Sequence, residues 1–530
     1  MKRAAVLLVL SLVVASCATM QSPGQSHVSR AVTALGGADA LGSVTSHYER
    51  GTVKQWEPEQ SMTPGGEMRF MSESIYEAIT DLGRRTTSID WSRKFAYPFP
   101  RHFVFNEVIA PEVGYVAGID AVSRTKQSIE ALPPGHNMSG LRLATAHREL
   151  RRASPVLLLE MLKNPARVAD VPDVTVGGAA HPAVEYRVAP NQAFTVMFDR
   201  ASGLPARIRT LDYDSIWGDV NYDLVLGDWQ TIDKVKVPMT RKYELGGRTV
   251  METKISSAAF NTAFAADRLA IPESFRAGAS KPATGPVPYQ WVIRRQFGNT
   301  YLDSDVPSFD TRATTGLKLA QLAPGVLHVV GGSHNALIVE MQDHLVVFDA
   351  PINDWQSTWV LAAAHNRYPK KPVKYLVLTH HHIDHAGGFR AFAAEGATLV
   401  VGQGTAAHYR KALASPFTRN PDLPSKDLSK TPVVEVADKH VLSDGKREVH
   451  AYLLPNPHAD GLLIGYVADA RLGYVTDVWS PGAGALPDKI TPPLAALVAG
   501  VKKAGITPEK FAGGHGTVAD YAPLAALEGK

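Results

Sequence analysis

Cysteine, charge of one sign and long apolar runs are all scarce in this 530-residue sequence. The only cysteine is Cys17, so the rest of the chain carries no thiol, as suits a protein in an oxidising compartment. Lysine and arginine number 55 against 51 aspartates and glutamates, a formal charge of +4 with no basic tract, which argues against nucleic acid as a partner. Beyond residue 15, no apolar run approaches the length needed to span a bilayer. What remains is the composition of an ordinary globular chain, long enough for two or three domains.

The N-terminus has the pattern of an export signal. A positively charged start precedes Ala4–Ala15, an apolar stretch too short to cross a bilayer but suited to the core of a signal peptide. The stretch ends at Val14-Ala15-Ser16-Cys17, which resembles the lipobox of bacterial lipoproteins. This resemblance implies that residues 1–17 are a lipoprotein signal and that a lipid on Cys17 anchors the protein in the membrane. Because Ala18 follows, rather than an inner-membrane retention aspartate, we expect the periplasmic face of the outer membrane. The alternative is an ordinary signal peptide with an incidental cysteine.

The most informative segment is rich in histidine. Thr379-His380-His381-His382-Ile383-Asp384-His385 follows the apolar run Val373–Leu378, which is partly β-branched and predicts a buried strand. Loops at strand ends are where an α/β fold places its chemistry, and imidazole and carboxylate are ligands that Zn²⁺ prefers. Since side chains two residues apart in an extended segment point the same way, His380 and His382 can bind one ion. Asp384 and His385 follow at once and can reach a second ion.

The spacing His380-x-His382-x-Asp384-His385 resembles the signature of the metallo-β-lactamase superfamily. Three later motifs follow in the order of that family: a histidine turn before the apolar run Leu462–Val467, an acidic residue ending a strand, and a histidine among glycines near the C-terminus. The resemblance implies two metal ions with one shared carboxylate. The implied ligands are His380, His382 and His458 for the first ion, Asp384, His385 and His515 for the second, and Asp477 as the bridge.

The same resemblance implies a fold and a mechanism. Residues 317–530 are expected to form an αββα sandwich with the metals at the rim between its two sheets. Two divalent ions, zinc or alternatively iron or manganese, would share a water and lower its pKa, so that a bridging hydroxide attacks a small-molecule substrate. Asp384 is the expected catalytic residue, because its free oxygen can orient the nucleophile. Asp349 is expected to support the ligand loop, His381 to face away from the metals, and His334 is a candidate to line the site.

Asp477 also bears on the substrate. In superfamily members that cleave β-lactams the corresponding position is usually not an aspartate, whereas a bridging aspartate is typical of thioester, lactone and phosphodiester hydrolases. The expected substrate is therefore a small ester, thioester or lactone. Two alternatives stay open: a metallo-β-lactamase acting on β-lactams, and a lipid- or lipoprotein-binding envelope protein whose metal domain is a relic.

Residues 26–275 have a different pattern of apolar and polar residues from the C-terminal part of the sequence. Helical signals come first, and most of the remainder alternates apolar and polar residues like antiparallel strands, as in Val184–Val188. Gly246-Gly247 between two such runs is the signal of a tight hairpin turn. Residues 276–316 carry proline, glycine, serine and threonine with little periodicity and are expected to be a linker.

This β-rich N-terminal segment resembles the lipoprotein-carrier and lipoprotein-sorting folds, a β half-barrel with a helical plug. The likeness implies a concave apolar surface that binds a lipid or another hydrophobic substrate. The alternative is that this segment is a structural spacer that holds the enzyme away from the membrane. The expected fold class is thus α/β, an αββα sandwich preceded by a mainly antiparallel β domain. The resemblance is carried by Ala34–Leu41, Asp199–Pro205 and Gly227-Asp228-Trp229.

Overall fold

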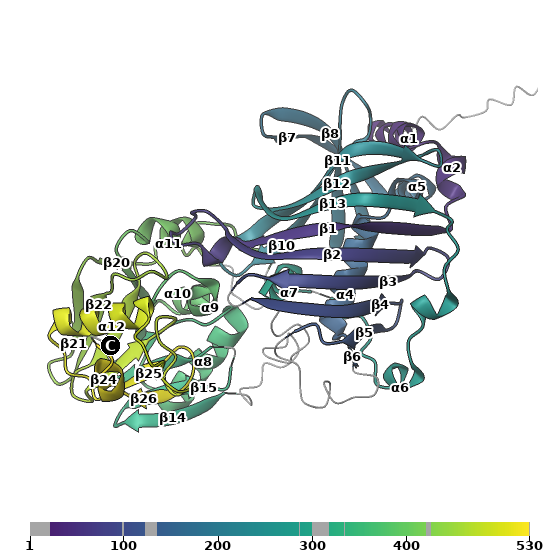
Figure 1. Ribbon diagram of the computed structural model, residues 1–530. Helices are drawn as coiled ribbons and strands as arrows, with labels where there is room; N and C mark the ends of the chain where they lie inside the picture. Colours follow the sequence, from purple (N-terminus) through teal and green to yellow (C-terminus); the bar gives the residue numbers. More distant parts are fainter. Residues whose placement is uncertain are drawn as a thin grey trace, which may run out of the picture.

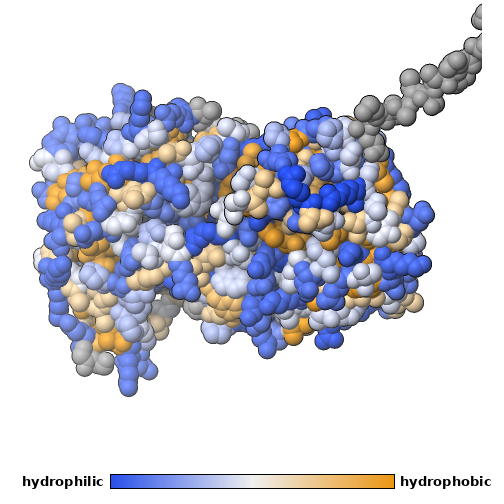
Figure 2. Space-filling model, turned by 90° about the horizontal axis from the view of Figure 1, so that it is seen from above, coloured by the Kyte–Doolittle hydropathy of each residue, from blue (hydrophilic) through white to orange (hydrophobic). Residues whose placement is uncertain are grey.

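The computed structural model describes residues 22–97, 100–121, 135–285, 287–298, 317–332, 334–419 and 426–528. The expected lipoprotein signal, with Cys17, lies outside the described residues, so the lipid anchor stays a prediction. Among the residues that are described, no helix is both long and apolar enough to cross a membrane. Two domains lie side by side, an N-terminal sheet domain and a C-terminal layered domain (Figure 1). On the face shown in Figure 2, hydrophobic and hydrophilic residues are interspersed over both domains.

One antiparallel sheet of thirteen strands makes up the N-terminal domain (Figure 1). The strand order is β6-β5-β4-β3-β2-β1-β13-β12-β11-β10-β9-β8-β7, so β1 pairs with β13 from the far end of the domain sequence. The expected hairpin at Gly246-Gly247 is confirmed: both glycines have positive φ, 57° and 85°, and they join β12 to β13. The strands are β1 (Ser46–Glu57), β2 (Arg69–Asp81), β3 (Thr86–Phe95), β4 (Arg101–Ile109), β5 (Gly114–Gly118), β6 (Gly135–Asn137), β7 (Val168–Val176), β8 (Ala179–Ala189), β9 (Gln192–Phe198), β10 (Pro205–Asp214), β11 (Gly218–Ile232), β12 (Val235–Leu245) and β13 (Arg248–Phe260).

Helices cover one side of this sheet, and α4, α5 and α7 lie behind the strands in Figure 1. Val28 of α1 and Leu157 of α5 are buried in one apolar core with Phe194 and Val196 of β9. This apolar face of the sheet is therefore covered by the protein's own helices, and the lipid-binding surface implied by the carrier resemblance stays a prediction. The helical segments are α1 (Pro23–Ala34), α2 (Ala38–Gly42), η1 (Pro58–Gln60), α4 (Gly140–Arg152), α5 (Leu157–Lys163), η2 (Pro165–Arg167), η3 (Ala266–Leu269), α6 (Glu273–Arg276) and α7 (Tyr289–Gly298).

Helix α7 departs from the sequence expectation, because it lies within residues 276–316, the interval expected to be a linker. It packs on α4, β1 and β10, and its Arg294 guanidinium is buried against the carboxylate of Asp214, with Nη2 donating to Oδ2 at 2.6 Å. Val292 and Ile293 are buried as well. The proline- and glycine-rich residues that precede it, 277–288, obscured this short helix in the sequence. Within the same interval, residue 286 and residues 299–316 lie outside the described part of the chain.

A buried ion pair ties α4 to the sheet. Arg148 donates from Nη1 and Nη2 to the two carboxylate oxygens of Asp212 at 2.6 and 2.9 Å, and its guanidinium lies 3.7 Å from the ring centre of Tyr289. Arg148→Ala is expected to lower the free energy of unfolding by about 3–5 kcal/mol, since Asp212 would stay buried without its counter-charge. Urea denaturation of the full chain measures this, with the exposed Arg187→Ala as control. A loss below about 1 kcal/mol, the size of a surface pair, would contradict it.

Two sheets face each other in the C-terminal domain. The first has seven strands in the order β14 to β20, and the second has six in the order β21 to β26. Helices α8, α10 and α11 cover the first sheet, and α12 and α13 pack on the second. The strands are β14 (Lys318–Ala323), β15 (Val326–Val330), β16 (Ala336–Glu340), β17 (Leu345–Phe348), β18 (Val373–Val377), β19 (Thr398–Gly402), β20 (Val433–Val436), β21 (Lys439–Ser443), β22 (Glu448–Leu453), β23 (Leu463–Val467), β24 (Leu472–Val475), β25 (Lys510–Gly513) and β26 (Val518–Asp520). The helices are α8 (Asp354–Arg367), α9 (Ile383–Ala386), α10 (Phe389–Ala394), α11 (Ala406–Leu413), α12 (Pro492–Ala504) and α13 (Ala522–Ala525).

Strand β17 shows why this part of the sequence forms a layered core. All four of its residues are buried. Val346 and Phe348 belong to the apolar cluster between the two sheets, whereas Leu345 and Val347 belong to the cluster under the helices. A strand that is covered on both faces needs a continuous apolar run rather than alternation. The expected αββα sandwich, preceded by a mainly antiparallel domain, is thereby confirmed.

The two domains contact each other where β10 turns into β11. Ile216 lies in the apolar cluster under α10, and its carbonyl accepts from Nε of the buried Arg390 at 3.2 Å. Asp219 accepts from the backbone N–H of Thr418 and of Arg419, at 2.9 Å each. The sheet domain is thus docked directly against the helical layer next to the histidine-rich loop.

Candidate metal centre

The seven residues expected to bind metal come from four connections at one edge of the two sheets. His380 to His385 follow β18 and enter the short helix α9, and Asp477 follows β24. His458 lies between β22 and β23, and His515 lies between β25 and β26. All four connections thus join or leave strands of the two sheets, which brings the seven side chains to the same edge.

The first ligand group contains His380, His382, His458 and Asp477, whose candidate ligand atoms all lie within 4.8 Å of one another. Nε2 of His458 is 3.0 Å from Nδ1 of His382 and 3.3 Å from Oδ2 of Asp477. Nε2 of His380 is 3.1 Å from the same carboxylate oxygen. Three imidazoles and one carboxylate thus converge on one point.

The second group contains Asp384, His385, His515 and again Asp477. Nε2 of His385 is 3.1 Å from Nε2 of His515 and 3.0 Å from Oδ2 of Asp477. Oδ1 of Asp477 is 2.7 Å from Nε2 of His515, and Oδ2 of Asp384 is 3.6 Å from Nε2 of His385. Asp477 is the one residue common to both groups, which is the position that a bridging carboxylate requires.

The backbone at the two key aspartates is left-handed. Asp477 has φ +57° and Asp349 has φ +63°, a region that aspartate tolerates better than most residues. Gly514 lies against the ligands so closely that a Cβ there would come 2.9 Å from Cε1 of His385 and 2.4 Å from Cγ2 of Thr476. A larger residue at position 514 would therefore collide with His385 and Thr476, so glycine there lets the chain pass close to the ligands.

Buried polar atoms in the cluster fit a metal ion. Nε2 of His380 and Oδ2 of Asp477 are buried and take part in no hydrogen bond among the described residues, although they lie 3.1 Å apart. A buried polar atom without a partner is costly, and coordination to a cation removes that cost. The donor set of imidazole nitrogens and carboxylate oxygens suits zinc and related divalent ions.

The electrostatics of the cluster point the same way. Burial, with His381 and His458 nearby, lowers the pKa of His382 to about 3, and burial also holds the pKa of His380 well below its usual range. Both imidazoles are therefore neutral, as ligands must be. Burial alone would lower the pKa of His385 too, but the carboxylates of Asp477 and Asp384 outweigh it and raise that pKa well above its usual range. The carboxylates thus favour a positive charge at this point.

Hydrogen bonds behind the ligands fix which nitrogen faces the cluster. Nδ1 of His385 donates to Oδ2 of Asp349 at 3.0 Å, so Nε2 is left for the second ligand group. Asp349 also accepts from the Thr379 backbone N–H at 2.8 Å through Oδ1. Asp349 therefore orients the ligand loop, the role expected for it from the sequence.

His334 and His381 lie next to the ligands but in neither group. Nε2 of His334 is 3.5 Å from Oδ2 of Asp384, and its ring centre is 4.6 Å from that of His515. His381 is fully buried, and its Nε2 donates to the Ser61 carbonyl at 2.9 Å. His334 thus borders the second group, whereas His381 points to the N-terminal domain.

Residues 60 and 61, which were not predicted from the sequence, come from the N-terminal domain and contact two of the ligands. Gln60 donates from Nε2 to Oδ1 of Asp384 at 2.8 Å, and the Ser61 carbonyl accepts from Nε2 of His382 at 2.9 Å. No motif marks these positions. The one sequence cue is proline at 58, which indicates a turn but not its partner.

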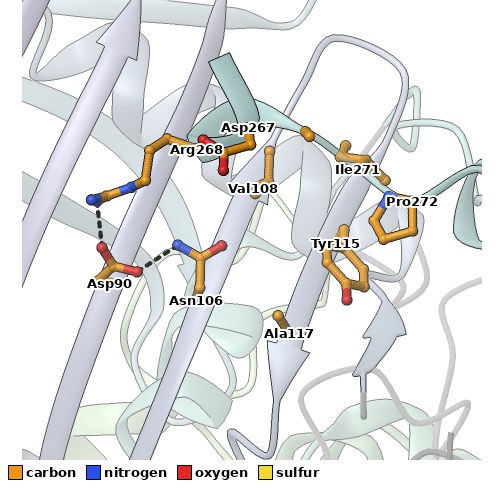
Figure 3. Close-up of a pocket in the computed structure, with 10 residues that line it drawn as sticks. Asp90, Asn106, Val108, Tyr115, Ala117, Asp267, Arg268, Ile271 and Pro272 are labelled. Atoms are coloured by element: carbon orange, nitrogen blue, oxygen red, sulfur yellow. Dashed lines mark hydrogen bonds and ion pairs between the residues drawn. The ribbon is translucent and has the colours of Figure 1, made fainter. Parts of the chain in front are cut away.

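A pocket of about 430 Å³ lies elsewhere, on the sheet domain against β3, β4 and β5 (Figure 3). Its polar side chains pair with one another: Arg268 donates to Asp90 at 2.5 Å, and Asn106 donates to Asp90 at 2.8 Å. None of its ten lining residues is a histidine or a cysteine. This pocket therefore lacks the imidazole ligands that the histidine cluster brings together.

Comparisons with known proteins agree with the fold of the C-terminal domain. Residues 329–515 match the family model of the metallo-beta-lactamase superfamily. This region, which holds all seven candidate ligands, is a metallo-β-lactamase domain. No curated protein matches the sequence.

Solved structures similar to this chain include three with low sequence identity. A stereoselective inverting sec-alkylsulfatase from Pseudomonas sp. is 19% identical with a TM-score of 0.31, covering 40% of each chain. A metallo-beta-lactamase from Pontibacter korlensis is 18% identical with a TM-score of 0.30, covering 40% of this chain and 98% of that one. The metallo-beta-lactamase FIM-1 from Pseudomonas aeruginosa, in its mono-zinc form, is 16% identical with a TM-score of 0.31, covering 41% and 97%. The chain thus spans less than half the length of the alkylsulfatase.

Proposed function

We propose that this protein is a binuclear metal-dependent hydrolase of a small ester, thioester or lactone. The observation that carries the proposal is the pair of ligand groups that share Asp477. His380, His382 and His458 would hold one ion, Asp384, His385 and His515 the other, and Asp477 would bridge them. Zinc suits this donor set, with iron and manganese as the other candidates.

The chain's own residues supply the positioning. When bound, two such ions polarise the substrate's carbonyl and lower the pKa of a water towards neutrality. His382 and His385 are held by hydrogen bonds on their outer nitrogens, so that their inner nitrogens keep fixed directions. Asp384 turns Oδ2 to the cluster, while Oδ1 is engaged by Gln60. The carboxylate that we expect to orient the nucleophile is thereby held in one rotamer.

Asp477 supports the substrate class. An aspartate at the bridging position is typical of thioester and lactone hydrolases in the superfamily that this domain resembles. A relic domain would be expected to lose a ligand, and here all seven remain together. We further propose that a lipid on Cys17 tethers this activity to the cell envelope.

Metal removal tests the proposal. Dialysis against a chelator is expected to abolish hydrolysis of model esters, thioesters or lactones, and adding back zinc, iron or manganese is expected to restore it. Circular dichroism before and after dialysis checks that the domain stays folded. If adding the metal back restores hydrolysis of a β-lactam but of no ester, thioester or lactone, the proposed substrate class is wrong and the protein is a β-lactamase. Hydrolysis that survives complete metal removal would refute the metal-dependent mechanism.

A further inference from the structure

The connection between β1 and β2 brings residues of the N-terminal domain into contact with the candidate metal ligands. Three consecutive residues of this connection meet the ligand motifs. Gln60 bonds to Asp384, Ser61 accepts from both His381 and His382, and the Met62 carbonyl accepts from the Asp460 backbone N–H at 2.8 Å. Asp460 is two residues after His458. The connection therefore touches the motifs of both ligand groups at once.

The orientation of the Gln60 amide is fixed from both ends. A carboxylate only accepts hydrogen bonds, so the NH₂ group of Gln60 must face Asp384. The Tyr97 hydroxyl donates to Oε1 of Gln60 at 2.9 Å, on the other side of the same amide. Arg69 donates from Nε to the backbone carbonyl of Gln60 at 2.7 Å, and its guanidinium lies 4.5 Å from the ring centre of Tyr97. Tyr97 and Arg69 thus hold Gln60 so that it can direct one oxygen of Asp384.

The Ser61 carbonyl selects the tautomer of His382. Because Nε2 of His382 donates to this carbonyl, the lone pair lies on Nδ1, the nitrogen that is 3.0 Å from Nε2 of His458. Donation from the outer nitrogen of a ligating histidine to a carbonyl fixes the ring and strengthens it as a ligand. Here the carbonyl belongs to a different domain from the ligand.

Buried contacts anchor the connection at its base. Arg294 of α7 pairs with both Glu57 and Asp214. Glu59, only 1% exposed, accepts from Nε1 of Trp217 at 2.8 Å. These pairs lie between the β1 end, α7 and the β10–β11 turn, so the position of the connection depends on the whole sheet domain.

We propose that the N-terminal domain is an integral part of the metal centre, in which Gln60 and the Ser61 carbonyl are positioning groups for the ligands Asp384 and His382. This inference rests on the proposed metal binding. It assigns the sheet domain a role other than a spacer or a lipid carrier. Loss of the Gln60 contact should weaken the second ion selectively, since Asp384 belongs only to the second group.

Metal affinity of the full chain tests this assignment. Gln60→Ala and Gln60→Glu are compared with wild type by competition with a chromogenic chelator, using zinc and then cobalt, whose visible absorption reports ligand geometry. The affinity for the second ion is expected to fall by about 10–100-fold, as for other groups that orient ligands. Gln60→Glu should be the weaker binder, because it places a second carboxylate against Asp384. Gln230→Glu, an exposed glutamine on β11, is the matched control.

Tyr97→Phe keeps the ring and removes only the hydroxyl that holds Gln60, so it tests the same chain of contacts with little risk to folding. It is expected to lower the second affinity in the same direction by a smaller factor. If wild type binds two ions and all three variants bind both as tightly, the positioning role is wrong while the proposed function stands. If wild type binds no ion, the proposed function itself has failed.

Discussion

Asp477→Ala is expected to abolish hydrolysis and to leave at most one tightly bound ion per chain. Asp477 places one oxygen 3.0–3.3 Å from nitrogens of three histidines and the other 2.7 Å from His515, so its removal opens both ligand groups. Since removing a group that only orients a ligand already costs about 10–100-fold, loss of the shared ligand should lower kcat/KM by more than about 100-fold. Metal analysis and steady-state kinetics on the same preparation measure both effects.

Two further variants separate ligand loss from backbone strain. Asp477 has φ +57°, and Asp477→Asn preserves a side chain that tolerates this conformation while removing the negative charge. Asp233 is an exposed aspartate with φ +46°, so Asp233→Ala makes the same change in similar backbone without a ligand role. Full activity in Asp477→Asn and Asp477→Ala would show that the shared carboxylate is not required.

Asp349→Asn is expected to weaken the second ion by about 10–100-fold and to leave the first nearly unchanged. The amide can still accept from the Thr379 backbone through its oxygen, but its NH₂ group then faces Nδ1 of His385, which is a donor. His385 would lose the bond that directs its other nitrogen into the second group. Stepwise metal titration by calorimetry resolves the two affinities.

Asp228→Asn is the matched control for this change, because Asp228 is exposed and also has positive φ, 52°. Equal weakening of both ions by Asp349→Asn would mean that the whole ligand loop shifts. Unchanged binding of both ions would contradict the orienting role of Asp349.

The metal domain could be predicted closely because its chemistry lies in short motifs. His380 to His385 share one loop, and the three later ligands each follow or precede an apolar run that predicts a strand. The covered sheets need continuous apolar runs such as Leu345–Phe348, and these are visible in sequence. The seven expected ligands accordingly meet in two groups that share Asp477.

The contribution of the N-terminal domain could not be predicted in the same way. Gln60 and Asp384 are 324 residues apart, and a single glutamine in a turn has no periodicity or spacing that names its partner. Helix α7 was hidden in a proline- and glycine-rich interval, although its Arg294 anchors Glu57 at the end of β1. Contacts between domains depend on how whole surfaces fit, and such fits leave no local pattern.

A crystal structure with anomalous scattering from bound metal tests the central claim most directly. The account predicts two anomalous peaks roughly 3.5–4 Å apart. One should be ligated by His380, His382 and His458, the other by Asp384, His385 and His515, with Asp477 contacting both. A single peak, or two peaks without a shared Asp477, would contradict the binuclear centre on which the proposed hydrolase activity depends.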